Sequence, residues 1–136
     1  MPYLVNHIHL KSSDPKKTAD WFVKAFNVKI VSDTVRPVGD RFIRTQAEGR
    51  DGQPGMMINI SSERTGEKLG PADSNAHYGL EHFGFDTDDM AADLKRFEAM
   101  GAEIKEVQNP MPNGQQIAFI AAPGGIRIEM IKQPTS

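Results

Sequence analysis

The sequence predicts an α+β fold built from two copies of a β-α-β-β-β module. Two strand-like segments, at 5–10 and 80–85, each hold a histidine and are each followed by a helix-like segment. Three further strand-like segments follow each helix-like segment. An aspartate also lies seven residues after His7 and seven residues after His82. Because the same order of elements recurs at matching spacing, we interpret the chain as an internal duplication.

The two expected helices begin and end with matching signals. Asp14, and either Asp88 or Asp89, are suitable N-cap residues, because a carboxylate accepts the free N–H groups of the first turn. Asn27 and Gly101 tolerate positive φ and mark the ends. The apolar residues at helical spacing are Ala19, Phe22, Val23 and Phe26 in the first copy and Met90, Leu94 and Phe97 in the second.

The strand-like segments and the breaks between them indicate how the chain divides into modules. The expected strands after the helices are 28–35, 41–46 and 56–60 in the first copy and 102–107, 115–121 and 126–131 in the second. Turn-forming Pro, Gly and Asn residues separate them. We therefore expect a single domain over 1–136, with module one at 1–62, a polar linker at 63–77 and module two at 78–136.

Composition excludes several classes of function. With 136 residues, 38% of them hydrophobic, the chain is long enough for a real core, and it has no cysteine for disulfides. The net charge is −2 without a concentrated basic face, so we do not expect nucleic-acid binding. No apolar run is long enough to span a membrane and no signal peptide is visible. We expect a cytoplasmic protein with a small-molecule partner.

The duplication also predicts a metal site. When the glycines before the two final strands are aligned, Asn59 corresponds to Glu129. Each module then offers one residue on its first strand and one on its last, which are His7 with Asn59 and His82 with Glu129. If the modules pack about a pseudo-two-fold axis, these positions converge on one concave surface. Two imidazoles and one carboxylate form a recognised site for Fe²⁺, Mn²⁺, Co²⁺, Ni²⁺ or Zn²⁺.

The setting of Glu129 supports this interpretation. The segment 126–132 alternates, so Glu129 shares a face with Arg127 and Ile131 while the apolar residues between them take the other face. A sheet with a core on one side and a polar cavity on the other has this pattern. Taken singly, each histidine is more simply a packed or solvated residue. The joint register favours His7, His82 and Glu129 as metal ligands.

His9 is a candidate catalytic residue. It follows His7 by two residues, so both side chains lie on the same face of the strand. A neutral histidine beside a metal-bound substrate suits general acid–base catalysis near physiological pH. The alternative is that His9 is the metal ligand and His7 lies beside it. The register with His82 favours His7 as the ligand.

These segments resemble the vicinal oxygen chelate superfamily, which includes glyoxalase I, bleomycin-resistance proteins and extradiol dioxygenases. The resemblance lies in 5–26, 80–104 and the ending 122–129. It implies a glyoxalase-like domain with a concave mixed sheet, and an enzyme whose divalent metal chelates vicinal oxygens of its substrate, with isomerase, lyase or dioxygenase chemistry. It also implies His7, His82 and Glu129 as ligands, and Asn59 as an optional fourth.

Departures from the family pattern reduce the number of reactions that the resemblance allows. Glyoxalase I resembles this layout but needs a glutamate where Asn59 stands, and an amide cannot accept a proton near neutral pH. The extradiol dioxygenases are similar but have a tyrosine shortly before the carboxylate ligand, where this chain has Phe119. The alternative to an enzyme is a non-catalytic small-molecule or antibiotic-binding protein. We expect a homodimer, in which each site draws its ligands from one chain or from two.

Overall fold

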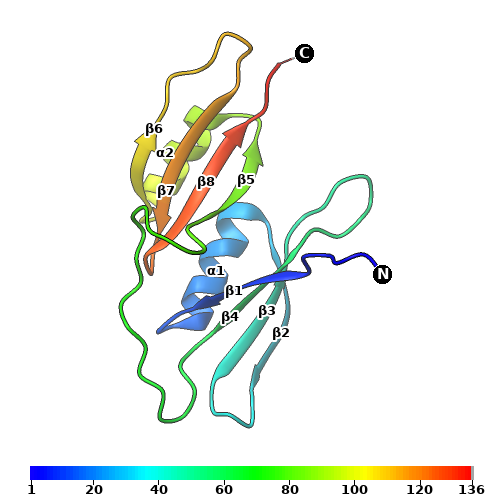
Figure 1. Cartoon of the computed structure of the whole chain (residues 1–136), viewed down its shortest axis with the longest axis vertical. Helices are drawn as coiled ribbons and strands as arrows, with labels where there is room; N and C mark the ends of the chain where they lie inside the picture. Colours follow the sequence, from blue (N-terminus) through cyan, green and yellow to red (C-terminus); the bar gives the residue numbers. More distant parts are fainter. Residues whose placement is uncertain (136) are drawn as a thin grey trace. The chain divides into compact units, whose positions relative to one another are not determined.

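The computed structural model describes residues 1–135 and divides the chain into two compact units. The first is Met1–Gly70 and the second begins at Pro71, so the boundary falls within the polar segment 63–77. The two units contain module one and module two respectively, and each is described by itself. Each unit contains one helix and one four-stranded sheet, which can be followed by their labels in Figure 1.

Module one has the expected order of elements. Its elements are β1 (His7–Lys11), α1 (Pro15–Phe26), β2 (Lys29–Val35), β3 (Arg41–Gln46) and β4 (Met57–Ser61). The sheet order is β1-β4-β3-β2. Strand β1 is parallel to β4, and the other two pairs are antiparallel. Helix α1 packs on β2, β3 and β4, which leaves the other face of the sheet for polar side chains.

Module two repeats this arrangement. Its elements are β5 (Phe83–Thr87), α2 (Met90–Ala99), β6 (Glu103–Val107), β7 (Gln116–Ala122) and β8 (Ile126–Lys132). The sheet order is β5-β8-β7-β6, with β5 parallel to β8. The predicted α+β fold of two β-α-β-β-β modules is therefore confirmed, with a mixed sheet in each module.

The two modules also share their strand register. In module one His9 pairs with Asn59 across β1 and β4, and in module two Gly84 pairs with Glu129 across β5 and β8. Each module also has an irregularity at the same place in its second strand, between Ile30 and Ser32 and between Ile104 and Glu106. The duplication thus extends to the register that positions the side chains.

The predicted helix boundaries are confirmed. The Asp14 carboxylate accepts from the Lys17 N–H at 3.2 Å, and the Asp89 carboxylate accepts from the Ala92 N–H at 3.1 Å. The N-cap of the second helix is therefore Asp89 and not Asp88. Asn27 caps α1 with φ 57°, and Gly101 follows α2 with φ 93°. These signals are local, because each cap acts on the first or last turn of its own helix.

The core of each module lies between its helix and its sheet. Phe22 and Phe97, at equivalent positions of α1 and α2, are both fully buried. Val23, which the helical spacing groups with Phe22, is 37% exposed. The buried stripe of α1 runs through Thr18, Ala19, Phe22 and Ala25, so the residue next to Phe22 turns away from the sheet.

The strand expected at 80–85 begins later than the sequence suggested. Strand β5 starts at Phe83, where pairing with β8 begins, and Leu80 is exposed in the loop before it. His82 therefore lies directly before the strand and not within it. Among the helices within residues 1–135, none combines the length and the apolar character that crossing a membrane requires.

Candidate metal-binding and catalytic residues

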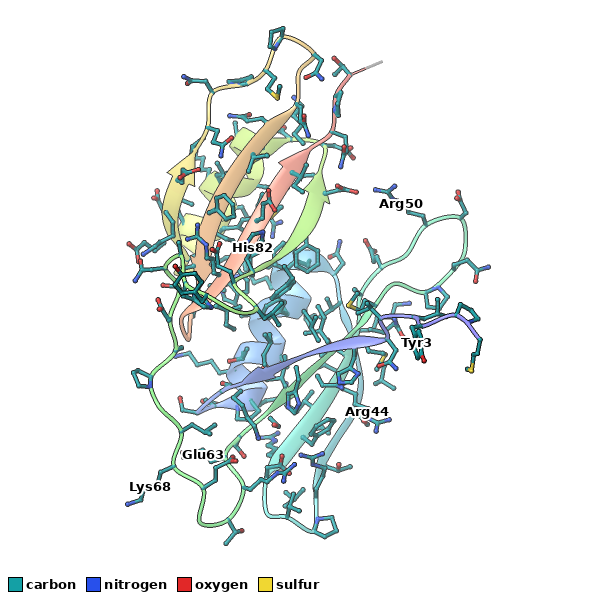
Figure 2. All side chains as sticks on the ribbon, viewed as in Figure 1. Tyr3, Arg44, Arg50, Glu63, Lys68 and His82 are labelled. Atoms are coloured by element: carbon teal, nitrogen blue, oxygen red, sulfur yellow. The ribbon has the colours of Figure 1, made fainter. Side chains whose placement is uncertain are left out.

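In module two, two of the three predicted metal ligands lie together. The His82 ring atom Nε2 is 3.0 Å from the Glu129 carboxylate atom Oε2. His82 lies directly before β5 and Glu129 lies on the neighbouring parallel strand β8, so the two side chains meet. Both side chains remain accessible, at 31% and 17% exposure. Figure 2 labels His82 among the side chains of this sheet.

The strands around this pair explain its geometry. The residues of β8 alternate as predicted, with Ile128 and Met130 buried and Arg127 and Glu129 on the open face. Gly84 stands opposite Glu129, and a Cβ there would lie 3.3 Å from the Glu129 carbonyl oxygen and 3.6 Å from its Cβ. The glycine thus keeps the space beside the carboxylate open.

A second carboxylate contacts His82 from the other side. Glu81 Oε1 lies 3.0 Å from His82 Nδ1 and accepts a hydrogen bond from Arg127 Nε, also at 3.0 Å. The hydrogen bond to His82, followed by that to Arg127, lowers the pKa of the Glu81 carboxyl. The sequence pattern did not single out Glu81, and its only signal is the position directly before His82.

In module one, His7 and His9 both lie on β1 with their side chains on the open face. His7 is exposed, and its Nδ1 is hydrogen-bonded to Oδ1 of the preceding residue, Asn6. His9 Nε2 lies 2.8 Å from Ser61 Oγ on β4, and its ring meets the Phe42 ring edge-on at 5.4 Å. The two histidines thus use opposite ring nitrogens for their protein contacts.

A buried acid lies behind His9. Asp40 is fully buried in the turn before β3, where its carboxylate accepts from Arg36 Nε at 2.8 Å and from Arg36 Nη2. The Arg36 hydrogen bond is the largest cause that lowers the pKa of Asp40 to about 2, and Ser61 also bonds this carboxylate. Ser61 therefore links Asp40 to His9. The sequence patterns do not single out Asp40 or Ser61, because turn and strand patterns carry no sign of this contact.

The environment of His9 favours a neutral ring. Burial is the main cause that lowers its pKa below the ordinary value of 6.5, and the positive charges of Lys11 and Arg36 act in the same direction. Asp40 opposes them but does not reverse the shift. More of the His9 ring is therefore neutral near physiological pH than an ordinary histidine would be.

Asn59 corresponds to Glu129 but has different surroundings. It lies on β4 between His9 on β1 and Arg44 on β3. Its Oδ1 atom is buried and has no hydrogen-bond partner among residues 1–135. A buried polar oxygen normally has a partner, since leaving one unpaired costs free energy.

The residues of module two fit a divalent metal ion. An imidazole nitrogen and a carboxylate oxygen are the donors that borderline metals prefer. His82 Nε2 and Glu129 Oε2 lie 3.0 Å apart, which is the distance of an ordinary N–H···O hydrogen bond. It is also about the separation of two donors that each lie roughly 2.1 Å from one ion at the right angles of octahedral coordination. Among the described residues of either module taken alone, no three His, Cys, Asp or Glu side chains form a candidate metal cluster. His7, the third predicted ligand, belongs to module one.

The comparisons with known proteins agree with the fold. The family model for the Glyoxalase/Bleomycin resistance protein/Dioxygenase superfamily matches residues 4–130. No curated protein sequence matches the chain. A glyoxylase/bleomycin resistance protein/dioxygenase domain from Frankia sp. EAN1pec is similar in structure, with a TM-score of 0.73 and 20% identity over 97% of this chain and 98% of that one.

Structures of FosX, a genomically encoded fosfomycin resistance protein from Listeria monocytogenes, are also similar. Its monoclinic form at pH 6.5 has a TM-score of 0.72 and 17% identity over 99% of this chain and 96% of FosX. A FosX mutant complexed with Mn(II) and 1S,2S-dihydroxypropylphosphonic acid has a TM-score of 0.68 and 15% identity, covering 96% and 89%. At these identities the likeness concerns the fold alone. The family model spans nearly the whole chain, and this protein therefore belongs to the glyoxalase/bleomycin resistance protein/dioxygenase superfamily.

Proposed function

We propose that this protein is a divalent-metal-dependent enzyme that acts on a small molecule with two neighbouring oxygen atoms. The observation that carries the proposal is the separation of 3.0 Å between His82 Nε2 and Glu129 Oε2. This nitrogen–oxygen pair has the chemistry and the spacing of two ligands to one ion. When bound, the ion would act as a Lewis acid toward the substrate oxygens. Fe²⁺, Mn²⁺, Co²⁺, Ni²⁺ and Zn²⁺ all suit this donor set.

His7 is the third ligand in this proposal. It precedes the His9–Asn59 pair by two residues, as His82 precedes the Gly84–Glu129 pair, so the duplication makes the two histidines equivalent. The contact of His7 Nδ1 with Asn6 leaves Nε2 as the nitrogen for an ion. One metal site would combine His7 with His82 and Glu129 either from the same chain or from the two chains of a homodimer. We infer the homodimer, which analytical ultracentrifugation tests.

His9 is the proposed general base. Because Ser61 engages Nε2, the Nδ1 atom is the one that would accept a proton from the substrate. Its side chain lies on the same face of β1 as His7. A substrate held at His7 would thus have an acid–base group two residues along the same strand.

Isomerase or lyase chemistry is favoured over insertion of dioxygen. Phe119 pairs with Glu129 across β7 and β8, and its ring meets His82 edge-on at 5.1 Å. A phenylalanine has no hydroxyl that could donate to a substrate at this position. The FosX complex with Mn(II) and a vicinal dihydroxy compound illustrates a relative bound to a metal and a ligand with adjacent oxygens.

Metal analysis of the protein purified without added metal tests the proposal. We expect a divalent ion in the wild-type protein and in the control Glu98→Ala, which changes an exposed glutamate on α2. Glu129→Ala and His82→Ala should lose the ion while circular dichroism shows an unchanged fold. Equal metal content in all four proteins would overturn the proposed site. Tight small-molecule binding that survives chelation and the substitutions His7→Ala, His82→Ala and Glu129→Ala would instead favour a non-catalytic binding protein.

A further inference from the structure

The residue directly before each proposed metal-binding histidine contacts the same ring nitrogen. In module two, Glu81 Oε1 lies 3.0 Å from Nδ1 of His82. In module one, the side-chain oxygen Oδ1 of Asn6 is bonded to Nδ1 of His7. The two oxygens come from different residue types but occupy equivalent positions in the duplicated sequence. Each contact leaves Nε2 on the other side of the ring.

In module two the contacting carboxylate is itself held in place. The Glu81 atom that contacts His82 also accepts a hydrogen bond from Arg127 Nε at 3.0 Å. The Arg127 side chain is only 11% exposed, and its Nη1 donates to the Ser74 carbonyl at 3.2 Å. Arg127 is thus fixed at two points of its guanidinium group, and the position of Glu81 is fixed with it.

Phe119 restrains the same group of side chains. The Arg127 guanidinium lies 4.3 Å from the centre of the Phe119 ring, and the His82 ring meets Phe119 edge-on. Phe119 pairs with Glu129 on the adjacent strand. One aromatic ring therefore packs against both the arginine that holds Glu81 and the histidine that Glu81 contacts, so His82 has little freedom to rotate.

We propose that Glu81, held by Arg127, is a positioning residue that keeps His82 in the tautomer with the proton on Nδ1, and that Asn6 has the same role for His7. This inference rests on the proposed metal-binding function. With Nδ1–H donating to an oxygen, the lone pair of Nε2 is directed to the metal position, where Glu129 lies. A carboxylate on the far nitrogen of a metal-binding histidine also makes the ring more basic, and removing such a partner typically weakens metal binding by 10- to 100-fold.

The charges of module two fit this assignment. Glu81 and Glu129 contact opposite nitrogens of the His82 ring. Within residues 1–135, Arg127 forms an ion pair with Glu81 and not with Glu129. A carboxylate without a cation beside it would compete for the metal as a ligand. Because Arg127 occupies the Glu81 oxygen that faces the ring, Glu81 is suited to orient the histidine, while Glu129 remains available to the ion.

Co²⁺ titration followed by absorption spectroscopy tests the inference on the full-length protein. We expect Glu81→Ala to weaken Co²⁺ binding by about 10- to 100-fold, while Glu81→Gln, which keeps an acceptor oxygen, loses less. Arg127→Gln should fall between them. Glu98→Gln is the matched control on α2 and should bind as the wild type does. Unchanged Co²⁺ affinity in Glu81→Ala would overturn the positioning role and leave the proposed metal site intact.

A second measurement separates the two proposals. Nitrogen-15 NMR of metal-free Glu129→Ala reports the tautomer of His82 without a metal and without the Glu129 carboxylate, which lies 3.0 Å from Nε2 and competes for the proton in the wild type. Glu129→Ala should show the proton on Nδ1, and the double variant Glu81→Ala/Glu129→Ala should show a mixture of tautomers. A wild-type protein that binds Co²⁺ no better than His82→Ala overturns the proposed metal function and this inference with it. A proton on Nε2 of His82 in Glu129→Ala overturns the positioning role alone.

Discussion

Asn59 and Glu129 occupy the same position in the two sheets. Asn59 pairs with His9 on one side and Arg44 on the other, and Glu129 pairs with Gly84 and Phe119. The duplicated backbone is therefore the same at this position, and the side chains around it are different. Module two surrounds its carboxylate with a glycine and an aromatic ring, whereas module one surrounds its amide with a histidine and an arginine.

This difference predicts the effect of replacing Asn59. Its buried Oδ1 has no partner among residues 1–135, and an unpaired buried polar atom costs about 1–3 kcal/mol. In the metal-free protein we expect Asn59→Leu, which keeps the branched shape of the side chain, to raise the free energy of unfolding by about 1 kcal/mol. Urea denaturation measures this change. A clear loss of stability would show that the amide already has a stabilising partner.

Asp40 predicts a loss of stability in acid. Its pKa is lowered from 3.8 to about 2, mainly by the hydrogen bond from Arg36, so folding is favoured by the ionised form. This contribution is fully present above pH 3.8 and is lost as the pH falls toward 2. Asp40→Asn should reduce the dependence of unfolding free energy on pH across this window, relative to the wild type. Parallel pH profiles for the two proteins would contradict the assignment.

His9 and His77 should titrate on opposite sides of the ordinary histidine value. Burial, followed by the charge of Lys11, lowers the pKa of His9 below 6.5. Hydrogen bonds to the carbonyls of Asn75 and Leu80 raise the pKa of His77 above it. Proton NMR of the metal-free protein measures both. Lys11→Gln should move the His9 pKa upward and leave that of His77 unchanged, which makes His77 an internal control.

Much of the fold could be predicted from the sequence because its signals are local and repeated. The caps at Asp14 and Asp89 act within one turn of helix, and the alternation along β8 assigns Glu129 to the open face without knowledge of any partner strand. The start of β5 could not be found in this way. It depends on where pairing with β8 begins, which is at Phe83.

The candidate site was predictable only in part, for a related reason. Matching register between the modules identified His82 and Glu129, whose side chains the structure brings together. The contacts of Glu81 with Arg127 and of Ser61 with His9 join residues 46 and 52 positions apart. Such contacts leave no periodicity in the sequence. They become visible only when strands β5 and β8, or β1 and β4, are placed side by side.

The separate cores of the two modules give the last prediction. Phe22 and Phe97 are fully buried at equivalent positions in α1 and α2, and each packs within its own compact unit. Removing a buried aromatic ring costs about 3–5 kcal/mol, so Phe22→Ala and Phe97→Ala should both be strongly destabilising. Val23→Ala, which changes the exposed neighbour of Phe22, should cost no more than about 0.5 kcal/mol.

Amide hydrogen exchange shows which module loses stability in each variant. Because each ring fills the space between one helix and one sheet, Phe22→Ala should reduce amide protection in β1–β4 first, and Phe97→Ala in β5–β8. Equal loss of protection in both modules for both variants would mean that the modules unfold as one cooperative unit. Loss confined to the module that carries the substitution is the expected result, since strand pairing connects β1–β4 with one another and β5–β8 with one another.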